Sequence, residues 1–209
     1  SLNYEDKRHA GYHAFLDDLE SSLVAEFGKN KKVLEVGCGT GLILDRLKGI
    51  TFQSVGIDLS LGMLGKSAQR GLKVFQSSAT NLPFADDSFD VTYSFKVLAH
   101  VPEIKLALQE MARVTKPGGY VIAEFYNKSS IRYLRWLLRK NRGKRLKTGI
   151  FEGDIFTRYD RTSEMESYMP DSLEKKAVKG IIVWSPGSFI YNVPVLSSVF
   201  RFLEKFVTF

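Results

Sequence analysis

The chain has 209 residues, of which 44% are hydrophobic, and a formal net charge of +7. This length predicts one domain with a sizeable core, and no run reaches the ~18 apolar residues that a membrane-spanning helix needs. The single cysteine excludes an internal disulfide, and the three scattered histidines predict no zinc site. The polar start, SLNYEDKRHA, is unlike a secretory signal, so we expect a cytoplasmic protein without a metal.

Apolar runs and helix-like segments alternate through the first 125 residues. Periodicity predicts helices over 11–27, 41–48, 60–70 and 103–115, and strands over 32–36, 54–58, 73–77, 89–95 and 119–125. Gly28 and the turn at 116–119 are predicted to end two of these helices. The alternation predicts an α/β, three-layer, doubly wound, Rossmann-like fold with a mostly parallel sheet.

The pattern changes after Phe125. A basic helix and an insertion are predicted next, and then a strand over 177–184 and a helix over 195–206. We expect a single domain over 1–209 with three parts: 1–127, 128–176 and 177–209.

The stretch 33–41, VLEVGCGTG, combines a predicted strand with three glycines. It falls at the first strand-to-helix turn, where open parallel sheets bind ligands and where glycine allows a close approach to the backbone. Its G-x-G-x-G spacing differs from the G-x-G-x-x-G of dinucleotide sites, and Glu35 would repel a pyrophosphate. The predicted ligand therefore carries positive charge; the alternative is a tight connection that binds nothing.

This stretch resembles the first motif of the class I S-adenosylmethionine-dependent methyltransferases, and the resemblance continues through VGIDLS and QSSATNLPFADDSFDVTYSF to Phe125. It implies their fold, a substrate-side insertion after the fifth strand, a small-molecule acceptor and S-adenosyl-L-methionine as the cofactor. It also implies these cofactor-binding residues: Glu35, Gly37, Cys38, Gly39 and Gly41 for the methionine part, Asp58 for the ribose, Leu59, Met63 and Leu82 around the ring, Ser78, Ala79 and Thr80 for adenine, and Phe95. A helix cap is the alternative for Asp58.

Three departures from the family pattern narrow these expectations. Ser78 stands where many relatives have an acidic residue, so we expect adenine to contact the backbone of Ala79 and Thr80. The loop Ser94-Phe95-Lys96-Val97 lacks the Asn- or Asp-Pro-Pro-aromatic motif of enzymes that methylate exocyclic amines of bases, so that reaction is not expected. The family normally adds an antiparallel seventh strand, for which only 207–209 remain, so we expect a truncated or differently built end of the sheet.

Candidate residues for catalysis and substrate binding lie after the fourth and fifth strands. His100 is the histidine nearest the expected cofactor pocket, and histidine is suited to proton transfer near neutral pH. Packing under the helix or contact with the cofactor are its alternatives. Tyr126 is a candidate for substrate binding, Tyr159 could offer a ring wall or a hydroxyl, and Arg158 could bind an anionic group. A structural salt bridge is the alternative for Arg158.

The segment 131–147 carries eight Lys or Arg residues and no acid, whereas the rest of the chain has 22 basic and 23 acidic residues. Its apolar residues recur at helical spacing, so it could contact an anionic membrane that supplies a lipidic or quinone-like acceptor. Contact with RNA phosphates and a packed helix with a solvated basic face are the alternatives. The favoured function is methyl transfer to a small molecule; RNA or tRNA methylation and a non-catalytic cofactor-binding relative are the other two hypotheses.

Overall fold

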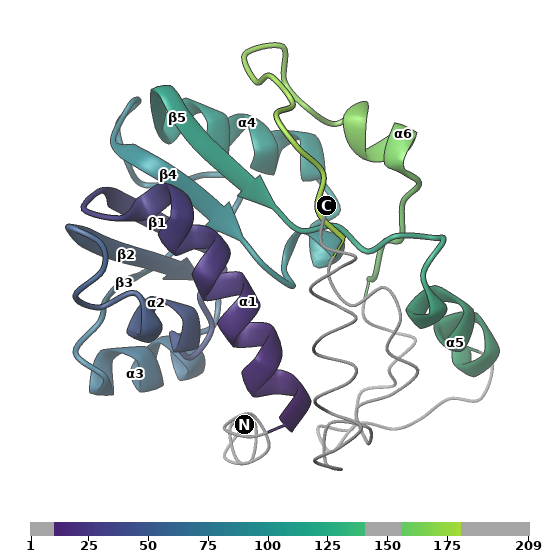
Figure 1. The fold of residues 1–209 in the computed structure, drawn as a ribbon, viewed down its shortest axis with the longest axis horizontal. Helices are drawn as coiled ribbons and strands as arrows, with labels where there is room; N and C mark the ends of the chain where they lie inside the picture. Colours follow the sequence, from purple (N-terminus) through teal and green to yellow (C-terminus); the bar gives the residue numbers. More distant parts are fainter. Residues whose placement is uncertain (1–10, 141–155, 181–209) are drawn as a thin grey trace.

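The computed structural model describes residues 11–140 and 156–180 of the chain (Figure 1). Five strands form one sheet in the order β3-β2-β1-β4-β5, and every pairing is parallel. The strands are β1 Lys32–Val36, β2 Gln53–Asp58, β3 Lys73–Gln76, β4 Phe89–Ser94 and β5 Thr115–Ala123. The order reverses between β1 and β4, and the predicted doubly wound α/β fold is confirmed.

The helices fall close to their predicted positions. They are α1 Gly11–Gly28, α2 Leu42–Arg46, α3 Leu61–Gln69, α4 Ile104–Val114, α5 Ile131–Lys140 and α6 Thr162–Glu166, with a 3₁₀ turn at Leu98–His100. Ser60 caps α3, because its hydroxyl accepts the Met63 N–H at 3.4 Å. No helix in the described ranges is both long and apolar enough to cross a bilayer.

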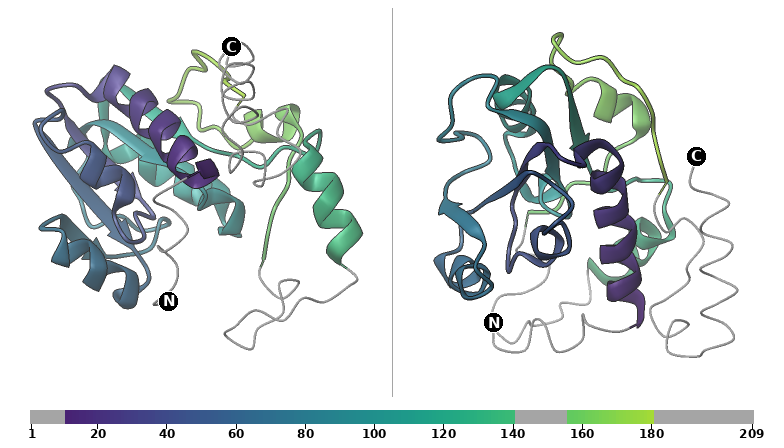
Figure 2. Two further views of the ribbon diagram at one scale, coloured as in Figure 1. Left: turned by 60° about the horizontal axis from the view of Figure 1, so that its bottom comes forward. Right: turned by 60° about the vertical axis from the view of Figure 1, so that its left-hand side comes forward.

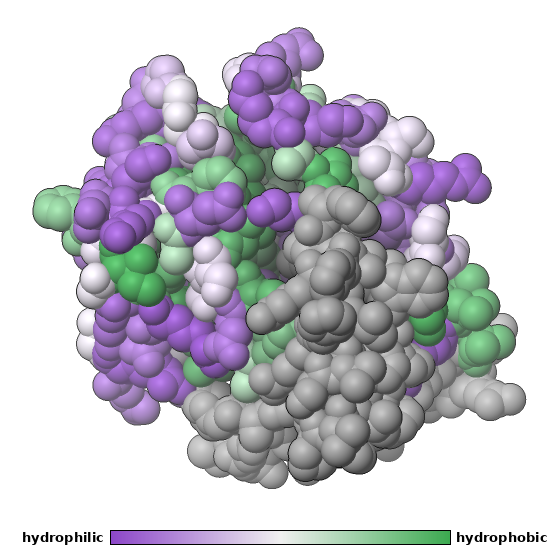
Figure 3. All heavy atoms as spheres, in the orientation of Figure 1, coloured by the Kyte–Doolittle hydropathy of each residue, from purple (hydrophilic) through white to green (hydrophobic). Residues whose placement is uncertain are grey.

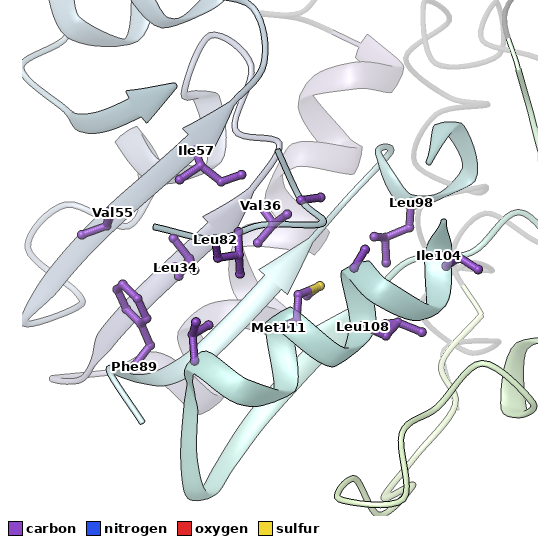
Figure 4. Close-up of a cluster of buried hydrophobic side chains, with 13 residues drawn as sticks. Leu34, Val36, Val55, Ile57, Leu82, Phe89, Leu98, Ile104, Leu108 and Met111 are labelled. Carbon is purple, nitrogen blue, oxygen red and sulfur yellow. The ribbon is translucent and has the colours of Figure 1, made fainter. Parts of the chain in front are cut away.

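The two faces of β1 pack against different helices, as the alternation of side chains along a strand requires. Leu34 and Val36 point into a core beneath α4, which Figure 4 shows in close-up. Val33 lies in a second core, formed with α1, α2 and α3. Glu35 shares the face of Val33, so its carboxylate lies on the α1 side of the sheet. Figure 2 shows α1 lying across that side.

One predicted boundary is wrong. We predicted a turn over 116–119 before the fifth strand, but β5 already begins at Thr115, which pairs with Phe89. The register then shifts before Val91 pairs with Tyr120. This irregularity accommodates Pro117, which has no N–H to donate to a ladder. The predicted end of the preceding helix is confirmed, since α4 ends at Val114.

Several expectations lie wholly or partly outside the described residues. Residues 177–180 form no strand, and the rest of the predicted strand over 177–184 lies beyond them. The predicted helix over 195–206, the expected truncation of the last strand and the 141–147 part of the basic segment also fall outside.

Candidate functional site: a glycine loop beside an aromatic cleft

The glycine loop follows β1 and is tied to β2. The N–H groups of Gly37 and Cys38 both donate to the Ile57 carbonyl at 2.8 Å. Gly37 has a φ of 82°, and a Cβ there would lie 2.2 Å from Cγ2 of Val97. Gly39 also has a positive φ, 54°, but a Cβ there would meet nothing within 4 Å. The loop is therefore closely packed at Gly37 and open at Gly39, where a ligand can approach the backbone.

Asp58 ends β2 and faces this loop. Its Oδ2 accepts the Gly39 N–H and its Oδ1 accepts the Ser60 N–H, both at 2.8 Å. Ser60, not Asp58, is the N-cap of α3. The two hydrogen bonds fix the carboxylate at a partly exposed position, and its remaining lone pairs can accept two neighbouring hydroxyl groups.

Glu35 is a nearly buried carboxylate beside the loop, with 4% of its surface exposed. Tyr93 donates its hydroxyl to Oε2 of Glu35 at 3.3 Å. Burial raises the pKa of Glu35 well above its ordinary value, and the nearby negative charge of Glu20 raises it further, against the lowering effect of the Tyr93 hydrogen bond. A cation in this region would stabilise the ionised form.

The other predicted cofactor residues divide into exposed and buried ones. Leu59 is 68% exposed and Met63 is partly buried, so both are accessible beside Asp58. The Ser78 hydroxyl lies 2.8 Å from the Thr80 hydroxyl and accepts the Thr80 N–H at 3.2 Å. Four residues have buried side chains: Cys38, Ala79, Leu82 and Phe95. Gly41 is closely packed, because a Cβ there would lie 2.3 Å from Leu72.

A cleft of about 1940 Å³ runs along β5 and reaches the loop after β4. Six of the residues that line it are Phe95, Lys96, His100, Tyr126, Trp136 and Tyr159. Two candidate substrate residues, Tyr126 and Tyr159, lie together in an aromatic wall, with ring centroids 5.5 Å apart. Tyr133 and Trp136 of α5 extend this wall, at 5.0 Å and 5.2 Å from the Tyr159 ring.

His100 lies at the cleft with a defined orientation. Its Nδ1 is 2.9 Å from the carbonyl oxygen of Phe156. Because a carbonyl can only accept, this contact favours the tautomer with the proton on Nδ1 and leaves Nε2 as a proton acceptor. The His100 ring also meets the Tyr126 ring edge-on at 5.9 Å.

Arg158, a predicted substrate-binding residue, has one guanidinium nitrogen hydrogen-bonded to the backbone, and its Nη1 is buried without a partner among the described residues. Its Nη2 donates to the carbonyls of Val101 at 3.2 Å and Pro102 at 2.7 Å. The guanidinium also lies 5.4 Å from the rings of Phe156 and Tyr168. Arg158 therefore holds its own segment against the loop after β4, and it is not among the described residues that line the cleft. The alternative for Arg158 was a salt bridge, but its hydrogen-bond partners among the described residues are backbone carbonyls.

Sequence reasoning missed a buried ionic group next to the glycine loop. Lys96, which has a φ of 62°, places its ammonium 2.7 Å from Oε2 of Glu20 and 3.3 Å from Oδ1 of Asp17. Its backbone N–H donates to Glu124 at 2.5 Å. One signal was present: Asp17 and Glu20 share a helix face with the buried Val24.

Comparisons with known proteins match the segment that contains the glycine loop and Asp58. Residues 34–123 match the family model described as a methyltransferase domain. The demethylmenaquinone methyltransferase of Paenarthrobacter aurescens is 46% identical over 98 residues, which are 46% of this chain and 39% of that protein. The enzyme of the same name from Renibacterium salmoninarum is 48% identical over 99 residues, 46% of this chain and 41% of that protein. The chain thus aligns with less than half the length of these relatives.

A solved structure supports the same assignment. The S-adenosylmethionine-dependent methyltransferase of Thermotoga maritima superimposes with a TM-score of 0.60 at 26% identity, over 76% of this chain and 70% of that chain. The predicted fold, family and cofactor, S-adenosyl-L-methionine, agree with these matches. Residues 34–123 therefore match a methyltransferase domain, and the described chain resembles an S-adenosylmethionine-dependent methyltransferase in its fold.

Proposed function

We propose that the protein transfers a methyl group from S-adenosylmethionine to a small, hydroquinone-like aromatic acceptor. The observation that carries the acceptor class is the aromatic cleft beside the loop after β4, in which Tyr126 and Tyr159 form one wall. Relatives named for demethylmenaquinone support it, and they match this chain over 98 and 99 residues. We also propose that the reaction takes place in the cytoplasm and that 1–209 acts as one domain.

The residues of the glycine loop fit the proposed cofactor. The open space at Gly39 can receive the methionine part, and Asp58 can accept hydrogen bonds from two ribose hydroxyls. Glu35 is buried with one hydrogen-bond partner in the described ranges, and its negative charge complements a sulfonium and an ammonium. Leu59 and Met63 provide apolar surface for the adenine ring, and the backbone at 79–80 provides polar contacts.

Bound S-adenosylmethionine supplies a methyl group activated by a sulfonium. The protein's main tasks are alignment and the exclusion of water, because methyl transfer is an in-line displacement. Trp136, which is partly exposed, can stack on a flat ring, and Tyr126 and Tyr159, which are each 7% exposed, can contact it by their edges. His100 can take the proton of an acceptor hydroxyl on Nε2, which makes the reduced acceptor a better nucleophile.

The function is tested with S-adenosylmethionine carrying a labelled methyl group and a reduced, demethylated naphthoquinone. We expect labelled naphthoquinol from the wild type and a kcat about 100-fold lower in His100→Gln, because the base is lost. His13→Gln is the matched control, since His13 also lines the cleft, and it should retain most of the activity. Label found in RNA instead would overturn the acceptor class, and an undiminished kcat in His100→Gln would overturn the base.

A membrane contact through the basic segment is the second part of the proposal. Helix α5 carries four basic and no acidic residues, and its Leu134 and Leu138 are 57% and 66% exposed. The opposite face holds Tyr133 and Trp136 against the aromatic cluster, so the exposed leucines form a separate apolar surface. Figure 3 shows this apolar surface over α5. Leucines flanked by arginines suit an anionic lipid surface better than RNA, whose phosphates offer no apolar contact.

Sedimentation with vesicles of phosphatidylglycerol and phosphatidylcholine tests this contact. We expect the wild-type chain to bind these vesicles and Leu134→Ser/Leu138→Ser to bind at least about tenfold more weakly, because two apolar side chains no longer enter the interface. Leu106→Ser is the control, since Leu106 is an exposed leucine on α4. Equal binding by the two variants would contradict the contact, as would retention on tRNA rather than on vesicles.

A further inference from the structure

An unpaired carboxylate oxygen is buried between α1 and the loop after β4. Glu20 is fully buried, and its Oε2 accepts from the Lys96 ammonium at 2.7 Å. Its Oε1 has no hydrogen-bond partner in the described part of the chain. Burying a charged oxygen without a partner costs free energy that folding alone does not return. The buried Oε1 can therefore accept a hydrogen bond from a donor that the described residues do not provide.

The surroundings of Glu20 hold more negative than positive charge. Lys96 is the cation in contact with it, and it also pairs with Asp17 and donates its N–H to Glu124. Burial raises the pKa of Glu20 to about 7, and it raises those of Glu124 and Glu35 in the same direction. Within residues 11–140 and 156–180, Lys96 is the cation in contact with Glu20.

This group lies beside the part of the site that would hold the methionine end of the cofactor. Glu35 lies on the α1 side of the sheet, and the charge of Glu20 acts on it. Gly37 follows Glu35 by two residues and packs against Val97. Val97 directly follows Lys96 in the sequence. The residue that packs against the glycine loop is therefore the neighbour of the residue that pairs with Glu20. Lys96 also lines the cleft.

We propose that Glu20, positioned by Lys96, binds the α-ammonium group of S-adenosylmethionine through its unpaired Oε1. The proposal rests on the proposed function and adds a residue from α1, outside the 34–123 segment that matches the family model. The ammonium supplies the donor that Oε1 lacks, and the cofactor's net positive charge offsets the excess of carboxylates. When Glu20 is protonated, binding releases its proton to solvent.

Three ligands distinguish this contact from a structural role. Titration calorimetry with Glu20→Gln should show roughly 10- to 100-fold weaker binding of S-adenosylmethionine and of S-adenosylhomocysteine, which both carry the ammonium. Binding of 5′-methylthioadenosine, which lacks the aminocarboxypropyl group, should not change. Asp18→Asn is the matched control, because Asp18 is an exposed carboxylate on the same helix. It should bind all three ligands as the wild type does.

The pH dependence of binding gives a second readout. Below about pH 7 Glu20 must lose a proton to bind a cation, so wild-type affinity should rise by up to about tenfold per pH unit as the pH increases from about 5 and level off above about pH 7. Glu20→Gln should flatten this rise. The charged groups that face Glu20 are Lys96, Asp17 and Glu124, and Glu124 also feels Arg132. These four residues are present in both the wild type and Glu20→Gln. The difference between the two pH profiles therefore reports the titration of Glu20.

The outcomes separate this inference from the function itself. Wild-type protein that binds none of the three ligands overturns the proposed function. Wild-type binding together with unchanged affinities in Glu20→Gln overturns only the role of Glu20. An equal loss for all three ligands assigns Glu20 a structural role, and a loss confined to S-adenosylmethionine assigns it to the sulfonium; either result overturns the ammonium contact.

Discussion

Asp58→Ala is expected to raise the Kd for S-adenosylmethionine by roughly 100-fold, measured by titration calorimetry. In the proposed site the substitution would remove the acceptor for two ribose hydroxyls, and the loss of even one charge-assisted hydrogen bond costs about 1.5–3 kcal/mol, so about 100-fold is a lower bound. It also removes the acceptor for the Gly39 N–H, so the open side of the glycine loop loses its attachment to β2. Because ribose is common to all three ligands, the affinity for 5′-methylthioadenosine should fall as well.

The affinity for 5′-methylthioadenosine distinguishes the proposed role of Asp58 from that of Glu20. Asp58→Ala weakens the ligand without the aminocarboxypropyl group, and Glu20→Gln does not. Asp86→Ala is the control, since Asp86 is an exposed carboxylate paired with Arg113. If Asp58→Ala bound the cofactor as tightly as Asp86→Ala, the cofactor site would lie elsewhere.

Gly37→Ala is expected to lower the free energy of unfolding by at least about 3 kcal/mol. A non-glycine residue in the left-handed region costs roughly 1–2 kcal/mol. The new Cβ would also lie 2.2, 2.8 and 2.9 Å from Cγ2, Cγ1 and Cβ of Val97. A rotation of the valine cannot relieve all three contacts, because its own Cβ is one of them. Chemical unfolding measures the difference.

Gly71→Ala separates the steric cost from the backbone cost. Gly71 has a φ of 71°, close to the 82° of Gly37, but a Cβ there would meet nothing within 4 Å. We expect Gly71→Ala to lose only the roughly 1–2 kcal/mol of the backbone term. Similar losses of unfolding free energy in the two variants would mean that Val97 moves away at little cost. The close packing at Gly37 would then not contribute to stability.

Most of the fold could be predicted because its signals are local. The strand predicted over 32–36 is β1, and the helix predicted over 103–115 is α4 within one residue at each end. The start of β5 was missed because it depends on a partner strand. Its first residue pairs with Phe89, 26 positions earlier, whereas Pro117 and its neighbouring glycines are locally typical of a turn.

The candidate site was predictable only where a motif lies in one continuous stretch. The glycine loop and Asp58 were expected from short patterns, and the structure connects them through the Gly39 N–H. The contact between Lys96 and Glu20 spans 76 positions, and no local pattern announces it. Arg158 shows the same limit, because its Nη2 donates to carbonyls 56 and 57 positions away, which no local pattern indicates.

The position of α1 has a consequence for where the folding unit ends. Helix α1 precedes the matched segment 34–123, yet it covers the face of β1 and β4 that carries Val33, Val91 and Glu35. A fragment cut to the conserved motifs would expose this apolar face to water and leave the Lys96 ammonium without its two helix carboxylates. We therefore expect a stable fragment to include α1 as well as residues 34–123, since the helix both covers the sheet and neutralises Lys96.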